Sequence, residues 1–270
     1  MPRGFNRVYM EKAIVVISFD GYKDLWDTFF ECFEKFFPDC TLPVYLITNN
    51  EMPTYPHATV VTTGDEVSWS HRLRRALEEI PEDTLLVLLE DYFLCEKTSS
   101  TKINELFQCF AENDYDYLRV IPIPIQYRWK KNGAYPLDPS ALYGVNLQAA
   151  IWKKAYLQKL LYEDDFSAWE FEARQKTKSN MRIDGNCATL NYIGLNYLNG
   201  VIQGKWYPRT VKELKKYGII VPTEKRPVIK RHKLIVMDVK NWLAHHVPAK
   251  IICALKPIAV RAGYKFVTKD

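Results

Sequence analysis

The sequence predicts an α/β fold with a mostly parallel central sheet flanked by helices. Two continuous apolar runs, residues 13–19 (AIVVISF) and 84–89 (TLLVLL), have the composition of strands that are covered on both faces. Segments with apolar residues at helical spacing separate these runs from further short strands. Because strands that alternate with helices form parallel sheets with helices on both faces, this alternation sets the predicted architecture.

The first half of the chain carries the clearest alternation. The first predicted helix ends before Pro38, the second begins near Ser70, and the third is capped by Ser99 or Ser100. Strands are predicted at residues 13–19, 44–48, 59–62, 84–89 and 117–121.

The second half is less regular. Residues 122–144 are rich in proline and aromatic residues and are predicted to form a long loop or short hairpin at the edge of the sheet. A strand at 147–152, helices at 153–161 and 167–174, and two helices within 233–262, separated by Pro248, complete the prediction.

The composition is that of a globular protein and names no function. Six cysteines occur singly, with no C-x-x-C pair and no histidine at metal-ligand spacing, so we expect free thiols in a reducing compartment. No apolar run reaches the length that spans a bilayer, and the first residues lack the pattern of a secretory signal. These features predict a cytoplasmic protein.

Charge is distributed unevenly along the chain, whose net charge is +5. Residues 205–270 hold 16 Lys or Arg and only 4 Asp or Glu, whereas the preceding residues are acidic overall. Such a basic block indicates an anionic partner, which could be a membrane surface, a phosphorylated acceptor or nucleic acid. The alternative is a solvated helix surface without a partner.

Two adjacent carboxylates stand where the strand at 84–89 ends. Glu90 and Asp91 leave a buried strand at the edge of the sheet where ligands bind in open α/β folds. Carboxylates in such a crevice are costly unless they bind a cation or accept hydrogen bonds. The alternative is an acidic turn before the next helix.

The order of VVISFDG, LLEDYFL, LQAAIW and SAWEFE along residues 12–206 resembles bacterial GT-A-fold glycosyltransferases, notably those that build capsule, lipopolysaccharide or other cell-envelope glycans. The resemblance implies a GT-A-like catalytic domain at 1–206, and the basic charge and helical pattern of the remaining residues predict a basic, mostly helical extension at 207–270. It also implies a nucleotide-sugar donor, with UDP-sugars favoured, and a saccharide or lipid-linked acceptor. The basic extension would then rest on the inner face of the plasma membrane.

Such enzymes hold a divalent cation with an Asp-x-Asp motif, and this sequence has Glu90-Asp91-Tyr92 in its place. By the resemblance, Asp91 is the first metal ligand and Glu90 the second, with Mn²⁺ or Mg²⁺ as the cation. Mg²⁺ often uses one or two protein carboxylates together with phosphate oxygens.

An acceptor hydroxyl needs a base to take its proton, and the resemblance implies a glutamate in SAWEFE. Glu170 is the first candidate and Glu172 the second, and direct displacement would invert the anomeric carbon. Ser167 and Glu170 also have the spacing of a capping box, in which Glu170 serves the helix N-terminus instead.

The remaining candidates are donor-binding residues that the fold analogy places around the same edge. Arg72 is preferred over Trp69 there, because Trp69 suits the core as well as sugar stacking. The Gly204-Lys205 pair resembles a late element near the donor site. The full set is Ser18, Asp20, Asp24, Asn49, Trp69, Ser70, Arg72, Glu90, Tyr92, Gln148, Gly204 and Lys205.

Two other classes stay open at this point. A nucleotidyltransferase also uses a carboxylate-bound metal, although no glycine- and lysine-rich phosphate loop follows the first strand. A non-enzymatic nucleic-acid-binding protein would use the basic block. The sequence contains no recognised nucleic-acid-binding motif, so we do not expect a nucleic acid as a partner. Hydrolase, kinase and dehydrogenase motifs are missing.

Overall fold

A computed structural model describes residues 10–65, 68–122, 131–141, 144–161, 165–177 and 184–234. Its elements are β1 (Lys12–Ile17), η1 (Asp20–Tyr22), α1 (Lys23–Phe36), β2 (Val44–Thr48), β3 (Ala58–Thr62), α2 (Trp69–Glu79), β4 (Thr84–Leu89), β5 (Tyr92–Leu94), α3 (Ser100–Glu112), β6 (Tyr117–Arg119), β7 (Ala134–Pro136), β8 (Ala150–Lys153), α4 (Lys154–Leu161), α5 (Ala168–Thr177), β9 (Cys187–Leu190), β10 (Tyr197–Asn199), β11 (Val201–Ile202), β12 (Lys205–Trp206) and α6 (Pro208–Lys216).

The central sheet has eight strands in the order β3-β2-β1-β4-β8-β6-β9-β7. Strands β3, β2, β1 and β4 are parallel neighbours, and β6 pairs in parallel with β9. β8 lies antiparallel between β4 and β6, and β7 is antiparallel to β9. The predicted α/β fold with a mostly parallel sheet is therefore confirmed.

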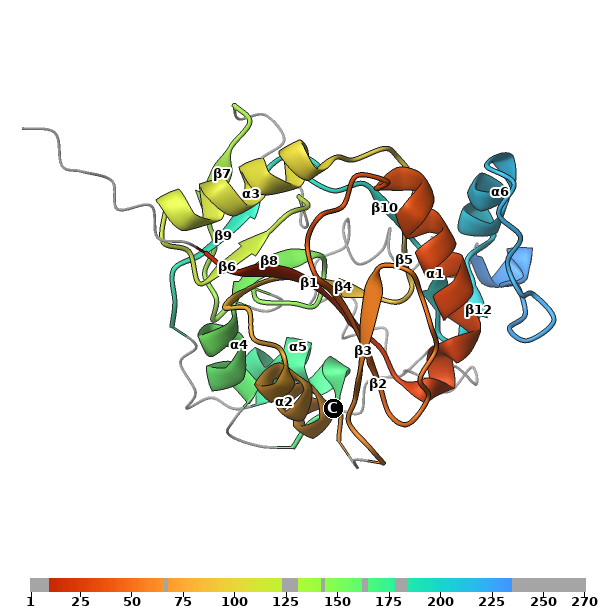
Figure 1. Ribbon diagram of the computed structural model, residues 1–270, viewed down its shortest axis with the longest axis horizontal. Coiled ribbons are helices and arrows are strands. Elements are labelled where there is room, and N and C mark those ends of the chain that lie inside the picture. The colour runs from red at the N-terminus through yellow and green to blue at the C-terminus, as the bar shows by residue number, and fades with distance from the viewer. Residues whose placement is uncertain are drawn as a thin grey trace, which may run out of the picture.

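Two layers of helices cover the sheet, as Figure 1 shows. The alternating side chains of β1 separate the two sides: Ile14 and Val16 join the core under α1 and α3, while Ala13, Val15 and Ile17 join the core under α2 and α4. A strand with both faces buried reads as a continuous apolar run, which is why residues 13–19 were recognisable in the sequence.

Several predicted boundaries shift by a few residues. The strand expected at 147–152 starts only at Ala150, because residues 147–149 approach the sheet without pairing in its ladder. Ser68 caps α2 by accepting a hydrogen bond from the His71 N–H, and Ser99 caps α3, as one of the two sequence alternatives had it. Part of the predicted loop at 122–144 forms β7, and residues 123–130 and 142–143 lie outside the described residues.

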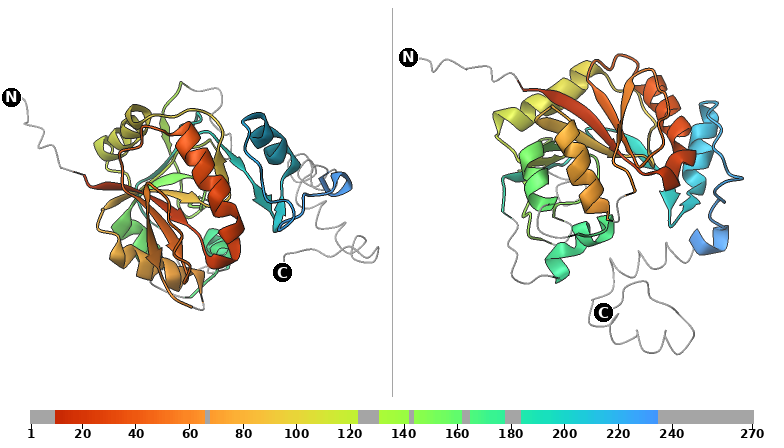
Figure 2. Two further views of the ribbon diagram at one scale, coloured as in Figure 1. Left: turned by 45° about the vertical axis from the view of Figure 1, so that its right-hand side comes forward. Right: turned by 60° about the horizontal axis from the view of Figure 1, so that its bottom comes forward.

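The chain beyond residue 206 packs against the body through residue 229. The Trp206 N–H donates to Pro227 O and the Ile229 N–H donates to Trp206 O. Leu214, Ile219 and Val221 are buried in the core cluster that contains α1. Figure 2 shows α6 beside α1 in both of its views.

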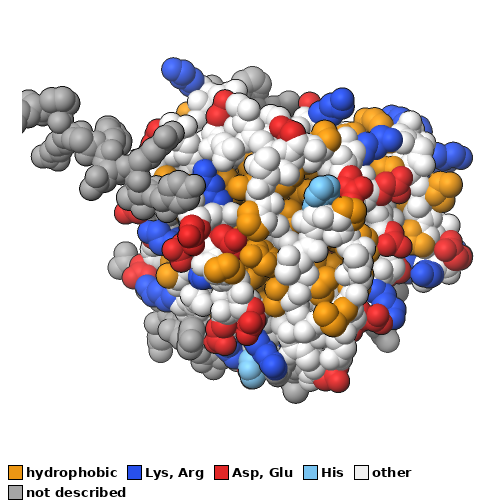
Figure 3. All heavy atoms as spheres, viewed as in Figure 1, with side chains coloured by type: hydrophobic (Ala, Val, Ile, Leu, Met, Phe, Trp, Pro, Cys, Tyr) orange, Lys and Arg blue, Asp and Glu red, His pale blue; other side chains and the backbone are white. Residues whose placement is uncertain are grey.

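The predicted helices within 233–262 fall almost wholly among residues 235–270, which lie outside the described residues. Among the residues that the structure does describe, no helix is long and apolar enough to cross a membrane. The five described cysteines are free, as expected. On the face in Figure 3, acidic and basic side chains mix around the periphery and apolar side chains gather near the middle.

Candidate active site

The candidate site lies at the carboxyl edge of the sheet, where the loops after β1, β2 and β4 meet the chain entering β8. Ile17, the last residue of β1, pairs with Ile47 in β2 and with Leu89 in β4. The residues that follow these strands therefore emerge side by side. Because β8 runs antiparallel to β4, the residues before Ala150 enter at the same edge.

Glu90 and Asp91 form the link between β4 and β5. Glu90 is 7% exposed, and Asp91 is half-buried with its Oδ1 atom shielded and without a hydrogen-bond partner among the described residues. The backbone of this link is fixed, because the Gly200 N–H donates to Asp91 O at 2.7 Å. A Cβ on Gly200 would lie 1.9 Å from the Phe93 ring, so only glycine allows this approach.

Burial controls the charge of both carboxyl groups. It raises the pKa of Asp91 from 3.8 to about 7, against the opposing effects of a backbone hydrogen bond and the Arg226 charge. Burial, followed by the Asp91 charge, raises the pKa of Glu90 well above its usual value. A pair of this kind favours a proton or a cation in its neighbourhood.

Two arginines approach this carboxyl pair from different segments. The charges of Arg226 and Arg72 both act to lower the pKa of Glu90. Arg72, at the start of α2, donates to Asn49 Oδ1 at 3.2 Å and lies 5.3 Å from the centre of the Phe19 ring. Burial lowers the pKa of Arg72, while the charges of Glu90 and Asp20 raise it.

Three predicted donor-binding residues hold the loops of this edge together. Both oxygens of Asp20 accept backbone N–H groups, from Asn49 at 2.9 Å and from residues 50 and 51 at 3.0 and 3.2 Å. Asn49 returns a bond by accepting the Asp20 N–H at 3.1 Å. Ser18 accepts the Trp26 indole N–H at 2.7 Å and is 4% exposed. These contacts tie the loop after β1 to the loop after β2 and to α1.

Tyr92 and Gln148 meet at the start of β8. Gln148 donates from Nε2 to the Tyr92 hydroxyl at 3.0 Å and accepts from the Tyr197 hydroxyl at 2.6 Å. The Tyr92 and Tyr197 rings stack with centroids 4.5 Å apart. Gln148 therefore has partners at both ends of its amide, and this network joins β5, β8 and β10.

The two glutamates of SAWEFE have different surroundings. Glu170 is exposed, and its Oε2 accepts the Ser167 N–H at 2.7 Å and the Ser167 hydroxyl at 2.8 Å. The Glu170 N–H donates to Ser167 Oγ at 3.3 Å, which completes a capping box. These hydrogen bonds lower the pKa of Glu170. Glu170 therefore caps the N-terminus of α5, as the capping-box alternative from the sequence has it.

Glu172 is the glutamate that turns inward. Its Oε1 accepts the Leu147 N–H at 2.9 Å, just before β8, and the side chain is half-buried. Burial raises the pKa of Glu172, against the effect of that backbone bond. Its charge also raises the pKa of Tyr92, after the larger effects of burial, Tyr197 and Asp91, so Glu172 lies within electrostatic reach of the carboxyl edge.

Trp69 and Ser70 are used in packing. The Trp69 ring lies 5.5 Å from that of Phe171, and Ser70 is fully buried, with its Oγ accepting the Phe166 N–H at 3.0 Å. Gly204 and Lys205 belong to the β11–β12 hairpin, where Gly204 has φ +72°. That conformation favours glycine, so the turn itself accounts for Gly204.

Three residues of this edge were not predicted from the sequence. They are Tyr22, Tyr197 and Arg226, and Arg226 forms a bidentate ion pair with Asp24 at 2.8 and 3.0 Å. Arg226 lies in the basic segment that the sequence analysis assigns to an extension. Because this segment has many Lys and Arg residues, the sequence does not distinguish Arg226 as a site residue. Its position depends on how residues 207–229 pack.

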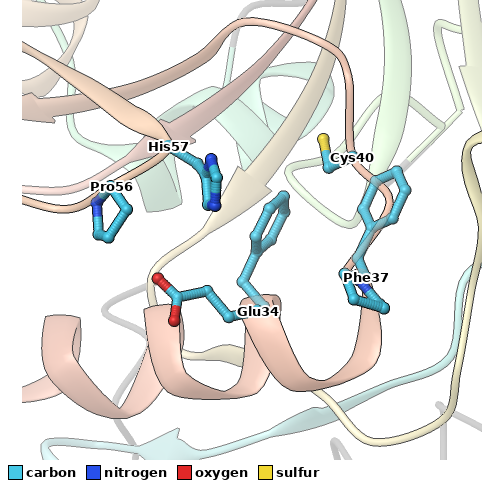
Figure 4. A pocket seen from close by; sticks show the side chains of 7 residues that line it. Glu34, Phe37, Cys40, Pro56 and His57 are labelled. Atoms are coloured by element: carbon cyan, nitrogen blue, oxygen red, sulfur yellow. The ribbon is translucent and has the colours of Figure 1, made fainter.

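A separate small pocket lies at the opposite, amino-terminal edge of the sheet (Figure 4). Side chains from the end of α1, from the segment between α1 and β2 and from the turn before β3 line it, among them Glu34, Phe37, Cys40 and His57. The Cys40 thiol contacts Leu42 O at 3.9 Å, and burial raises its pKa, so the thiol is not activated. This pocket is remote from the carboxyl edge and contributes nothing to the candidate site.

Within the described ranges, no group of three or more His, Cys, Asp and Glu side chains could hold a metal ion alone. Glu90 and Asp91 still offer two adjacent carboxylates, and the shielded Oδ1 atom of Asp91 has a free acceptor position. This donor set fits a cation such as Mg²⁺ that takes its remaining ligands from phosphate and water.

No protein-family model and no curated protein matches the sequence. Among solved structures, the chain is similar to residues 1–349 of TarS from S. aureus, with 13% identity, a TM-score of 0.46, and coverage of 67% of this chain and 58% of that one. A longer TarS structure is covered over only 35% of its length.

Two further structures are similar at the same level. A cytidylyltransferase from Leptospira borgpetersenii has 13% identity and a TM-score of 0.40 over 79% of this chain and 98% of that chain. A putative nucleotide-diphospho-sugar transferase from Desulfovibrio desulfuricans has 8% identity and a TM-score of 0.41 over 67% and 80%. At these identities and TM-scores the likenesses concern the general fold alone.

The raised pKa of Asp91 predicts how stability depends on pH. Between about pH 4 and the folded-state pKa of about 7, the native chain binds more protons at Asp91 than the unfolded chain does. The free energy of unfolding of the metal-free protein should therefore fall as pH rises through this window. Urea denaturation at several pH values, with chelator, measures the slope.

The variant Asp91→Asn removes this titration and should flatten the slope, while Glu78→Gln, an exposed change on α2, should keep the wild-type slope. Equal slopes for wild type and Asp91→Asn would show that Asp91 ionises as it does in the unfolded chain.

Proposed function

We propose that this protein is a glycosyltransferase that moves a sugar from a nucleotide-sugar donor to a saccharide or lipid-linked saccharide acceptor. The observation that carries the proposal is the shielded Glu90–Asp91 pair at the carboxyl edge, with an Asp91 oxygen that has no partner in the described part of the chain and arginines from two segments nearby. Ligands of open α/β sheets bind at this edge. Carboxylates beside cations suit a diphosphate held through a shared metal ion.

The chemistry of transfer explains these parts. When the bond between the anomeric carbon and the diphosphate breaks, negative charge grows on the leaving phosphate oxygens. A bound Mn²⁺ or Mg²⁺ would supply Lewis-acid stabilisation of that charge. Asp91 is the proposed primary ligand and Glu90 the second. Arg72 lies close enough to meet the same phosphates, because its charge already acts on Glu90.

Glu172 is the proposed base that deprotonates the acceptor hydroxyl. Its half-buried position and raised pKa suit a proton acceptor, whereas the oxygen Oε2 of Glu170 is occupied by the capping box. Glu172 thus replaces Glu170 as the first candidate for the base. Direct attack assisted by Glu172 would invert the configuration of the anomeric carbon.

The acceptor side has one feature suited to a sugar. Trp169 is 77% exposed and stands one turn before Glu172, so its ring is available near the proposed base. Aromatic rings stack on the apolar faces of sugars. A glycan of the cell surface, such as capsule or lipopolysaccharide, is the proposed product class.

A nucleotidyltransferase is the second candidate, because a carboxylate-bound metal beside arginines also serves attack on an α-phosphate. The two reactions differ in their leaving group. A glycosyltransferase releases a nucleoside diphosphate, whereas a nucleotidyltransferase releases pyrophosphate.

A thermal-shift panel tests the proposed function. The panel contains UDP-, GDP-, CDP- and dTDP-sugars, including UDP-GlcNAc, with which TarS was crystallised, each with Mn²⁺, Mg²⁺ or chelator. We expect one nucleotide class to raise the melting temperature, by an amount that falls with chelator and in Asp91→Asn. Stabilisation by a nucleoside triphosphate with pyrophosphate release would favour the second candidate. No response to any nucleotide would reject both.

The base assignment is tested by paired substitutions in α5. Glu172→Gln should lower kcat by about 10²-fold or more with little change in donor KM, since a general base contributes on that order. Glu170→Gln should instead lower the melting temperature only slightly and leave kcat within a few-fold, because glutamine keeps the capping box but loses the charge of its acceptor. The opposite pattern would return the role to Glu170.

Membrane docking through the basic C-terminal residues is a further part of the proposal. Residues 235–270 carry six Lys or Arg and two Asp or Glu, and each basic residue near anionic lipid contributes about 1 kcal/mol. Removing these residues should abolish binding to phosphatidylserine vesicles at low salt. Unchanged vesicle binding by the shortened chain would contradict docking by this segment.

A further inference from the structure

Arg226 lies in the turn after α6, far along the chain from the strands that form the site. Its guanidinium makes two hydrogen bonds to Asp24, from Nε to Oδ2 at 3.0 Å and from Nη2 to Oδ1 at 2.8 Å. The side chains of this pair are 12% and 13% exposed. A bidentate, largely buried pair fixes the plane of the guanidinium.

The guanidinium is fixed beside the Glu90–Asp91 pair. It lies over the Tyr22 ring, 4.4 Å from its centroid. The charges of Glu90, Arg226 and Asp91 all shift the pKa of Tyr22, so the arginine and the two carboxyl groups lie within electrostatic reach of this tyrosine. Arg226 also lowers the pKa of Asp91 and of Glu90.

The other end of the guanidinium, Nη1, points away from Asp24. Nε and Nη2 donate to Asp24, Nη2 also approaches Gly21 O at 3.5 Å, and a hydrogen bond with the Tyr22 side chain adds to the rise in the pKa of Arg226. Nη1 faces the turn of the β11–β12 hairpin, where a Cβ on Gly204 would lie 3.8 Å away. A side chain at position 204 would occupy this space, and glycine leaves it open.

We propose that Nη1 of Arg226 binds the diphosphate of the nucleotide-sugar donor, with Asp24 holding the guanidinium in place and Gly204 leaving room for the phosphate. This assignment rests on the proposed function and completes its donor site. The fork geometry of an arginine matches phosphate oxygens, and its charge would stabilise the leaving nucleoside diphosphate. Asp24 is then a positioning residue and not a ligand of the donor.

The assignment also gives residues 207–229 a role in the reaction. Their anchoring on Trp206 and α1 keeps Arg226 at the carboxyl edge, since the Trp206 N–H holds Pro227 O directly after the arginine. The donor site would thus be completed by a segment that follows Gly204 and Lys205, the last site residues named from the sequence.

Isothermal titration of UDP, CDP, GDP and dTDP with Mg²⁺, each beside its nucleoside, tests the proposal. The wild-type protein should bind one diphosphate more tightly than its nucleoside. Arg226→Lys keeps a cation for Asp24 but loses the fork, and should weaken diphosphate binding about tenfold while nucleoside binding stays the same. Arg226→Gln should weaken it further.

Two more variants separate this role from folding. Lys225→Gln makes the same change of charge at an exposed neighbouring position and should bind like wild type. Gly204→Asn retains a residue that tolerates positive φ but fills the space beside Nη1, so it should also weaken the diphosphate and spare the nucleoside. Melting temperatures close to wild type would confirm that these variants fold.

The outcomes are distinct. Wild-type affinity for the diphosphate in Arg226→Lys and Arg226→Gln would overturn the role of Arg226 and leave the proposed function intact. A wild-type protein that binds none of the four nucleoside diphosphates would overturn the proposed function and this assignment together.

Discussion

The site depends on the burial of two adjacent carboxyl groups at the end of a central strand. β4 has neighbours on both sides, β1 and β8, and helices cover both faces of the sheet, so Glu90 directly after this strand is only 7% exposed. The charged form of such a group is costly without a compensating cation. Arg72 and Arg226 provide positive charge from two different segments. The start of α2 and the turn that contains Arg226 must therefore pack near this carboxyl pair.

Much of the polar chemistry at this edge serves rigidity. Asp20 uses both carboxylate oxygens to hold the loop after β2, and Ser18 holds the indole of Trp26. Because these side chains are already hydrogen-bonded within the protein, they fix the loops at this edge of the sheet. A framework fixed before binding lowers the ordering cost of recognition and keeps catalytic groups in position.

The two glutamates of α5 differ in what determines their positions: helix capping for Glu170 and packing against the sheet for Glu172. Ser167 and Glu170 satisfy the first N–H groups of the helix, as their spacing predicts from sequence alone. Glu172 lies two residues further along and turns toward the chain entering β8, where Leu147 donates to it. Which glutamate faces the site depends on the rotation of α5 against the sheet, and the sequence motif contains no information about that rotation.

The sequence by itself determined the layers of this protein. Continuous apolar runs identified β1 and β4, the period of apolar residues identified α1 to α3, and the position after β4 identified Glu90 and Asp91, because each of these signals is local. Only the tertiary structure decided that β8 runs antiparallel beside β4, that Glu172 lies inward, and that Arg226 reaches the site across the 202 residues that separate it from Asp24. Contacts of that range follow from how whole elements pack, and packing leaves no pattern in the residues near either partner.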